Sequence, residues 1–329
     1  MKRYLTSRRI FGKALGIALA TMFAGAASAE TWNMPVPYGD NNFHTLNHMQ
    51  FAKDLDAATS GGVSIKVHPS GSLFKHPEIK GAVRSGQVQL GEFLLSRLSN
   101  ENPVFGVDSV PFLAKSYDDA KKLWAVSRPV IEELLDKQGL MVLYAVPWPP
   151  QGLYAKKPVA KPDDMAGLKF RAYNAATERL AQIMKAVPTQ VEVADLAQAF
   201  STGRVDAMVT SPSTGFNTKA WDFLTNYYDV QAWLPKNIVV MNKRAFQRLD
   251  KATQEAVLAA AAKAEERGWA ASMAETGEKT KGLADNGIKV APPSDELLAA
   301  LIQAGETMTN EWLEQAGDAG KRLVEAFRK

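Results

Sequence analysis

Apolar and polar residues alternate between positions 167 and 212 with two different periods, which predicts strand, helix, strand, helix, strand with short connections. The first six side chains after Gly167 alternate between apolar and polar, in the order Leu168, Lys169, Phe170, Arg171, Ala172 and Tyr173. A period of two is typical of a short strand. Arg171 and Tyr173 therefore share one side of this strand near its carboxyl end, the edge at which open α/β sheets bind ligands.

The remaining elements of this stretch are a helix to about Lys185, a strand over 187–193, a second helix ended by Gly203 and a strand over 205–209. Asn174 and Asp195 are the expected N-caps of the two helices, because short polar side chains satisfy the free N–H groups of a first turn. The last strand leads into Thr210 and Ser211, small hydroxyl residues opposite Arg171.

The rest of the chain mixes strands and helices in the same way. Strands are expected at 31–37, 63–67, 88–95, 140–146, 227–233, 238–241 and 288–290, and helices at 77–85, 118–138, 214–224, 251–283 and 295–327. A further helix follows Phe43, with an apolar stripe of Leu46, Met49, Ala52, Leu55 and Ala58. The proline-rich segment 147–152 is interpreted as the first crossing between two domains.

Length and composition agree with two domains. The chain has 329 residues, of which 46% are hydrophobic, enough for one large or two medium cores, and we expect two. The sequence pI is about 9.0. The five basic residues of positions 1–29 account for it, since without them 34 basic residues face 35 acidic ones and the net charge is −1. This removes the main argument for a nucleic-acid partner.

The first 29 residues have the three parts of an export signal: a charged start, an apolar stretch over 14–27, and the cleavage sequence Ala27-Ser28-Ala29. We expect cleavage after Ala29 and a periplasmic protein. Residues 7–13 (SRRIFGK) also resemble the twin-arginine export motif, and an ordinary secretory signal is the alternative. No later segment approaches the roughly 20 apolar residues of a membrane helix. The absence of cysteine excludes disulfides and a lipid-anchoring cysteine.

Arg171 is the candidate that carries chemistry. A guanidinium donates two parallel charge-assisted hydrogen bonds to a carboxylate and stays charged at any accessible pH. The alternative from spacing alone is a surface arginine at the end of a strand.

Several segments resemble one family in family order. They are ATSGGVSIKVHPSGSL (58–73), VRSGQVQLGEF (83–93), VPFLAKSYDDAKKLW (110–124), DMAGLKFR (164–171) and TGRVDAMVTSP (202–212). The chain thereby resembles the DctP-type solute-binding proteins of tripartite ATP-independent periplasmic (TRAP) transporters, from about Met34 to the last helices. In that family the arginine that falls on Arg171 clamps the substrate carboxylate.

The resemblance implies an α/β, two-lobed periplasmic-binding-protein-like fold with a hinge cleft and a long helix spanning both lobes. Lobe I would comprise 30–150 and about 239–275, and lobe II 151–238 and about 276–329. The partners implied are a small organic acid and the small and large membrane subunits of a TRAP transporter. We expect a monomer without a cofactor or a nucleic-acid partner.

The expected ligand shell surrounds Arg171 with polar and aromatic groups, the composition of a small-molecule cleft. Its other members are Gln151, Trp148, Tyr173, Asn174, Thr210, Ser211, Phe216, Trp233, Tyr38, Asn41, Phe43 and Phe93. Several of these aromatic residues could equally belong to the core.

Gln151 marks a departure from the family pattern. Many relatives carry a second arginine after the first crossing, and its position falls near Gln151. A glutamine carries no charge, so a second ligand carboxylate here would lose its counter-ion at a cost of several kcal/mol. We therefore expect a monocarboxylate with an apolar or aromatic body, which could carry a hydroxyl or keto group for Gln151, Thr210 or Ser211, and weak or no binding of C4-dicarboxylates. Lys156 or Lys157 is the alternative source of a second charge.

Three rival interpretations are weaker. An exported enzyme lacks support, because no G-x-S-x-G, H-E-x-x-H, P-loop or G-x-G-x-x-G motif is present and no histidine follows residue 76. A solute-binding protein of another importer or of a sensor kinase would not carry the G-L-K-F-R context. His44 and His48 have metal-ligand spacing but lack a third ligand, so they are interpreted as loop and helix-surface histidines and no metal is expected.

Overall fold

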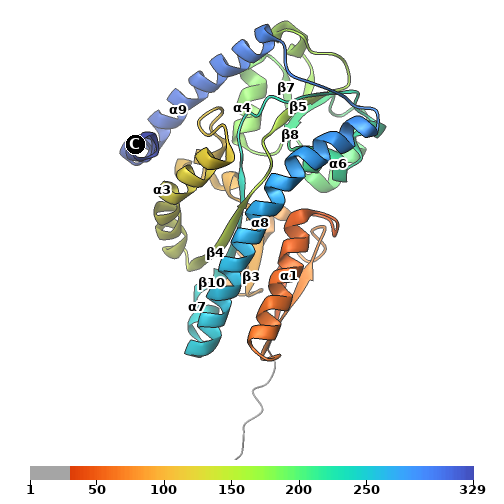
Figure 1. The fold of residues 1–329 in the computed structure, drawn as a ribbon. Coiled ribbons are helices and arrows are strands. Elements are labelled where there is room, and N and C mark those ends of the chain that lie inside the picture. Colours follow the sequence, from red (N-terminus) through yellow and green to blue (C-terminus); the bar gives the residue numbers. More distant parts are fainter. Residues whose placement is uncertain (1–29) are drawn as a thin grey trace, which may run out of the picture.

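The computed structural model describes residues 30–329, and the predicted export signal lies outside the described residues. The chain forms two α/β lobes with helices packed around three sheets (Figure 1). The mixed strands and helices that the sequence predicts are therefore present, and so is the two-lobed architecture.

The first lobe contains two small sheets. In one of them β1 and β2 pair in parallel, and in the other the strand order is β3-β10-β4 with antiparallel pairing. Its elements are β1 (Glu30–Pro35), α1 (Phe43–Ala58), β2 (Val63–His68), α2 (His76–Ser85), β3 (Leu90–Leu94), α3 (Tyr117–Asp136), β4 (Leu140–Pro147), β10 (Lys236–Asn242) and α7 (Lys243–Gln247).

The second lobe is built on a six-stranded sheet with the order β11-β9-β5-β8-β6-β7. Within it β6 runs parallel to both β7 and β8, so the carboxyl ends of these three strands meet at one edge. Its elements are β5 (Gly152–Ala155), β6 (Lys169–Ala172), α4 (Ala175–Ile183), β7 (Val187–Gln190), α5 (Leu196–Ser201), β8 (Ala207–Thr210), α6 (Pro212–Asn217), β9 (Asn226–Tyr228) and β11 (Lys289–Ala291). Short 3-10 segments, distributed over the whole described chain, are η1 (Leu95–Leu98), η2 (Pro103–Ser109), η3 (Pro162–Met165), η4 (Val193–Asp195) and η5 (Ala220–Asp222).

Two chain crossings connect the lobes and lie side by side. The Trp148 N–H donates to the Pro235 carbonyl at 2.8 Å, and the Gln151 N–H donates to the Trp233 carbonyl at 3.0 Å. The Ala232 N–H returns a bond to the Gln151 carbonyl at 2.9 Å. The prolines of 147–150 therefore belong to a paired, antiparallel connection rather than to a loose linker.

Two long helices pack against both lobes (Figure 1). Helix α8 (Lys251–Asp285) lies against β4 and α1 in the first lobe and against α6 in the second. Helix α9 (Asp295–Arg328) bends at Gly317, where φ is 56°, and packs against α4 on one side and against η2 and α3 on the other. The predicted long helix spanning both lobes is therefore present, while the residue boundaries of the lobes stay a prediction.

Helix α1 buries a different face from the one predicted. Leu46, in the predicted apolar stripe, is 53% exposed, whereas His44, Asn47 and His48 are buried. The reason is that this face of α1 meets polar groups of other elements. Asn47 Nδ2 donates to the Ala264 carbonyl at 2.8 Å, and His48 Nε2 lies 2.9 Å from Glu92 Oε1. The hydrogen bond of Asn47 offsets the cost of burying its amide. The interpretation of both histidines as loop or surface residues is wrong.

One strand was not predicted, and three local predictions also differ from the structure. The missed strand is β5; it begins at Gly152, where an added Cβ would lie 2.3 Å from the Tyr227 ring. The strand predicted over 227–233 covers only β9. The helix predicted over 214–224 ends near Asn217, because Lys219 adopts φ 51°. The Asp195 side chain makes no N-cap hydrogen bond, since a 3-10 turn precedes α5.

Candidate binding site

A cavity lies between the lobes at the edge where β6, β7 and β8 end. Its empty volume, including open solvent at its mouth, is about 430 Å³. The lining residues come from both lobes and from both crossings. They are Tyr38, His76, Leu94, Arg97, Trp148, Gln151, Arg171, Tyr173, Glu192, Val193, Thr210, Thr214 and Pro235.

Arg171 projects into this cavity from the end of β6 and is 4% exposed. Its Nε donates to the Val191 carbonyl at 3.0 Å, and its guanidinium carbon lies 4.7 Å from the centre of the Tyr173 ring. Among the residues that the structure describes, no carboxylate lies within salt-bridge distance of Arg171. Burial lowers the pKa of Arg171 to about 10, so the side chain is still a cation at neutral pH.

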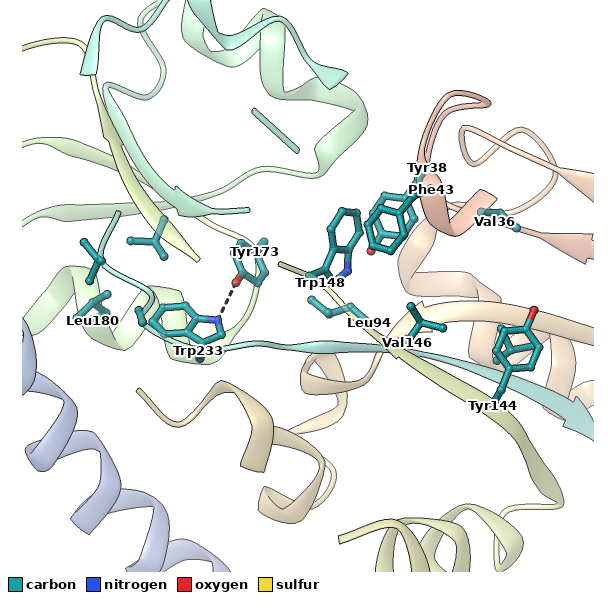
Figure 2. Close-up of a cluster of buried hydrophobic side chains, with 14 of the residues drawn as sticks. Val36, Tyr38, Phe43, Leu94, Tyr144, Val146, Trp148, Tyr173, Leu180 and Trp233 are labelled. Carbon is teal, nitrogen blue, oxygen red and sulfur yellow. Dashed lines mark hydrogen bonds between the residues drawn. The ribbon is translucent and has the colours of Figure 1, made fainter. Parts of the chain in front are cut away.

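Trp148 and Tyr38 form an aromatic wall from the first lobe (Figure 2). Their ring centres are 4.9 Å apart in an edge-to-face arrangement. Trp148 Nε1 donates to Asn237 Oδ1 at 2.9 Å, and the Tyr38 hydroxyl donates to the same oxygen at 3.3 Å. One buried amide therefore fixes the orientation of both rings.

Tyr173 and Gln151 face this wall from the second lobe and the crossing. The Tyr173 hydroxyl donates to Gln151 Oε1 at 3.1 Å and accepts from Trp233 Nε1 at 3.1 Å (Figure 2). Gln151 Nε2 donates one of its two N–H groups to the Pro149 carbonyl at 2.8 Å. Both polar ends of Gln151 are thus held in place by protein groups.

An ion pair across the cavity, Arg97 with Glu192, was not predicted. Arg97 of η1 contacts the Glu192 carboxylate at 2.9 Å and donates to the Tyr173 carbonyl at 3.2 Å. His76 Nδ1 lies 3.6 Å from the same carboxylate. A signal for Glu192 was present in the sequence, because it follows the end of the strand next to that of Arg171. Arg97 and His76 come from the other lobe, and no local pattern indicates their position.

The charge state of Glu192 follows from its neighbours. Burial alone would raise its pKa, but the neighbouring His76 and the charges of Arg97 and Arg171 outweigh burial and lower the pKa to about 2. Burial lowers the pKa of His76 below its ordinary value of 6.5 despite the nearby carboxylates. At neutral pH the cavity therefore holds two cations, one anion and a neutral imidazole.

The structure brings six of the predicted site residues to the cavity wall: Arg171, Gln151, Trp148, Tyr173, Thr210 and Tyr38. The other seven do not line it. Asn174 and Ser211 cap α4 and α6, with Asn174 Oδ1 accepting from the Thr177 N–H and Ser211 Oγ from the Thr214 N–H. Asn174 also donates to Ser96 Oγ of the first lobe at 2.8 Å.

The remaining predicted aromatic residues support the site from behind or belong to cores. Trp233 is fully buried and donates to the Tyr173 hydroxyl, and the ring of Phe43 packs edge-to-face against Trp148 with their ring centres 5.4 Å apart (Figure 2). Phe93 faces a hydrophobic core of the first lobe, and Phe216 packs against Trp221 in a core of the second. Asn41 is exposed in the loop before α1.

A second, larger cavity between η2, α4 and α9 has a different character. Its empty volume is about 880 Å³, and its charged groups are Arg179 and Glu311, which pair with each other near solvent. It contains no buried cation. Over residues 30–329 no cluster of three or more potential metal ligands is found, and no helix in this range is long and apolar enough to cross a membrane.

Comparison with known proteins gives a consistent result. The family model of the bacterial extracellular solute-binding protein, family 7 (DctP), matches residues 36–315. The chain is similar to the solved Bordetella pertussis DctP7, an extracytoplasmic solute receptor binding pyroglutamic acid, with 49% identity, a TM-score of 0.90, and coverage of 92% of this chain and 100% of that one.

Two further solved structures are similar over nearly their whole length. Bordetella pertussis DctP6, which also binds pyroglutamic acid, is 43% identical with a TM-score of 0.89, and covers 91% of this chain and 99% of that one. A marine metagenome TRAP solute-binding protein specific for pyroglutamate is 40% identical with a TM-score of 0.90 and the same coverage.

Proposed function

Since the chain belongs to the bacterial extracellular solute-binding protein family 7 (DctP), we propose that it binds a small monocarboxylate at Arg171 and that this ligand is pyroglutamate. Proteins of this family are periplasmic receptors that bind small organic acids and work with the membrane subunits of TRAP transporters, and they are not enzymes.

The observation that carries the proposal is the buried guanidinium of Arg171. A buried charge without a counter-ion is costly, and a ligand carboxylate would supply both the charge and two parallel hydrogen bonds. Arg171 Nε is already bound to the Val191 carbonyl, which fixes the plane of the guanidinium. Its two terminal nitrogens are then the donors for a carboxylate that enters from the cavity.

The balance of charges supports one carboxylate rather than two. Among the cations of the cavity lining, Arg97 pairs with Glu192, whereas Arg171 has no lining carboxylate within salt-bridge distance. Gln151 is neutral and bound on both sides. A second ligand carboxylate would approach Glu192 and be repelled. The solved relatives that bind pyroglutamate support the same ligand class, since pyroglutamate has one carboxylate on a flat lactam ring.

Isothermal titration with the mature chain tests the proposal. The protein is first unfolded in guanidinium and refolded to remove any co-purified ligand, and is then titrated with pyroglutamate and with succinate. We expect binding of pyroglutamate and weak or no binding of succinate. Tighter binding of succinate would show that a second charge is available in the cavity and would overturn the monocarboxylate assignment.

The role of Arg171 is tested in the same assay. Arg171→Ala should weaken pyroglutamate binding about thirtyfold or more, because loss of one partner of a buried charge pair costs roughly 2–5 kcal/mol. Arg171→Lys should restore little, since an ammonium group cannot form two parallel bonds. Arg84→Ala, which removes an exposed arginine of α2, is the matched control. Wild-type affinity in Arg171→Ala would remove Arg171 from the site.

Export is the second part of the proposal. Removal of residues 1–29 would leave Glu30, the first residue of β1, as the amino terminus. Amino-terminal sequencing of periplasmic protein should begin at Glu30, and an uncleaved chain would contradict the signal peptide. Replacement of Arg8 and Arg9 by lysine should stop export by the twin-arginine route and leave an ordinary secretory signal functional.

A further inference from the structure

Glu192 lines the same cavity as Arg171. It follows the end of β7, the strand that pairs with β6. Its side chain remains 29% exposed while Arg97 contacts it at 2.9 Å. A carboxylate has about four lone-pair sites. Arg97 and His76 together occupy only part of this capacity, so the carboxylate can accept one more hydrogen bond from inside the cavity.

The position of this carboxylate is fixed from the opposite lobe. Arg97 contacts both carboxylate oxygens, at 2.9 Å and 3.3 Å, and its Nη1 also donates to the Tyr173 carbonyl at 3.2 Å. His76 approaches one oxygen at 3.6 Å. An arginine fork with two contacts to one carboxylate restricts its orientation. Glu192 is therefore a preorganised acceptor rather than a mobile surface charge.

An ionised carboxylate beside the ligand site discriminates by chemistry. It can only accept hydrogen bonds, so the ligand group that meets it must carry an N–H or O–H. In pyroglutamate the lactam N–H is next to the carbon that bears the carboxylate. When Arg171 binds the carboxylate, the ring N–H therefore lies close to Arg171. Because Arg171 and Glu192 line the same cavity, Glu192 is placed to accept from this N–H.

We propose that Glu192, held by Arg97 and His76, is the specificity-determining residue that accepts the ligand N–H. This inference rests on the proposed function, because it assumes a carboxylate at Arg171. It assigns two adjacent groups of the ligand to two residues: Arg171, at the end of β6, binds the carboxylate, and Glu192, just after β7, selects rings that carry a donor beside it.

The test compares two ligands that differ only in this donor. In 3-oxocyclopentane-1-carboxylate a CH₂ group replaces the ring N–H of pyroglutamate, while the carboxylate, the ring size and the carbonyl are retained. Wild-type protein should bind pyroglutamate about ten- to hundredfold more tightly than the carbocyclic acid, because a hydrogen bond to a charged acceptor is lost. Glu192→Gln should reduce this preference to about threefold or less, as a neutral amide is a weaker acceptor.

Controls separate this inference from the proposed function. Glu101→Gln, which removes an exposed carboxylate paired with Lys80, should keep the wild-type preference. If wild-type protein binds both acids equally, or if Glu192→Gln keeps the full preference, the role of Glu192 is wrong while carboxylate binding at Arg171 stands. If wild-type protein binds neither acid, the proposed function and this inference both fail. The wild-type comparison needs no variant, so a folding defect in Glu192→Gln would not affect it.

Discussion

Asn237 connects the aromatic wall of the cavity to a buried carboxylate. Its Oδ1 accepts from Trp148 and Tyr38, and its Nδ2 donates to Glu92 Oε1 at 2.8 Å. Glu92 is fully buried and also contacts His48 at 2.9 Å. The network thus runs from the ligand cavity into the core of the first lobe, through groups that have few alternative partners.

Replacement of Asn237 should therefore affect both stability and binding. Asn237→Ala leaves the Trp148 N–H and the Tyr38 hydroxyl buried without their acceptor, and we expect the free energy of unfolding to fall by about 2 kcal/mol or more. Urea unfolding monitored by circular dichroism measures this loss. Asn310→Ala, at an exposed position of α9, should change it by less than about 0.5 kcal/mol. A similar small effect at Asn237 would contradict the network.

The lowered pKa of Glu192 also predicts that the free energy of unfolding depends on pH. Its pKa falls from the ordinary 4.5 to about 2 in the folded protein, so its contribution is present above pH 4.5 and is lost as the pH falls toward 2. The wild-type protein should exceed Glu192→Gln in free energy of unfolding at pH 6, and this difference should shrink at pH 3.5. Urea titrations at the two pH values measure it. If the difference in free energy of unfolding does not change with pH, the ionised Glu192 carboxylate is not stabilised by Arg97, His76 and Arg171 in the folded protein.

At the scale of elements, α8 approaches the first lobe closely at Gly268, where any larger residue would place a side chain against neighbouring atoms. A Cβ added at Gly268 would lie 2.4 Å from a Val146 methyl carbon and 2.8 Å from Asn47 Nδ2. At Gly277, on the same helix, nothing lies within 4 Å of an added Cβ. The two glycines therefore form a matched pair within one helix.

Gly268→Ala should lower the free energy of unfolding by about 1–2 kcal/mol, since overpacking costs about 1–3 kcal/mol and alanine returns up to about 1 kcal/mol of helix propensity. Gly277→Ala should raise it by up to about 1 kcal/mol, because only the propensity term acts. Chemical unfolding of the two variants measures both changes. Shifts of the same sign would show that β4 and α1 can move away from α8 at little cost.

The elements that the sequence predicts well are those specified by local signals. The stretch over 167–212 has clear alternation, and Asn174 caps α4 as expected. The buried face of α1 could not be predicted, because its polar residues contact groups that are distant in the sequence, Glu92 of β3 and the backbone of α8. Strand β5 was missed for a similar reason, since its pairing with β8 and β9 involves distant segments.

The same distinction applies to the site. Arg171 and Tyr173 could be placed from the end of a single strand, and Trp148 and Gln151 from the proline-rich crossing. Arg97 and His76 could not, because they reach Glu192 only when the first lobe lies against the second. Phe216 and Phe93 were predicted in the site because aromatic residues line small-molecule clefts. They pack in the hydrophobic cores of the two lobes, which also need large side chains.

At the scale of the molecule, contacts between the lobes should depend on the ligand. Arg97 with Glu192, and Ser96 with Asn174, join the two lobes beside the cavity. The paired crossings are the connections about which the lobes could rotate. A ligand bound between Arg171 of one lobe and the Trp148 wall would add to these contacts and favour the closed arrangement.

Small-angle scattering with and without saturating pyroglutamate should show a smaller radius of gyration for the bound protein. The ligand should also stabilise the fold by about 2.7 kcal/mol at a hundredfold excess over Kd, which a thermal-shift assay detects. Arg171→Ala should show neither effect at the same ligand concentration. Bound wild-type protein with an unchanged radius would contradict rotation about the crossings.

The position of β10 has a consequence for the order in which the chain folds. This strand lies between β3 and β4 in the sheet, yet residues 148–235 separate it from β4 in the sequence. Five strands of the second lobe, β5 to β9, are contiguous in the chain and can pair earlier, because pairings between distant segments form slowly. Until residue 236 is available, β3 and β4 have unpaired edges of the kind that promote aggregation. The first lobe, although it contains the amino terminus, therefore cannot complete its central sheet until the five strands β5 to β9 of the second lobe have been synthesised.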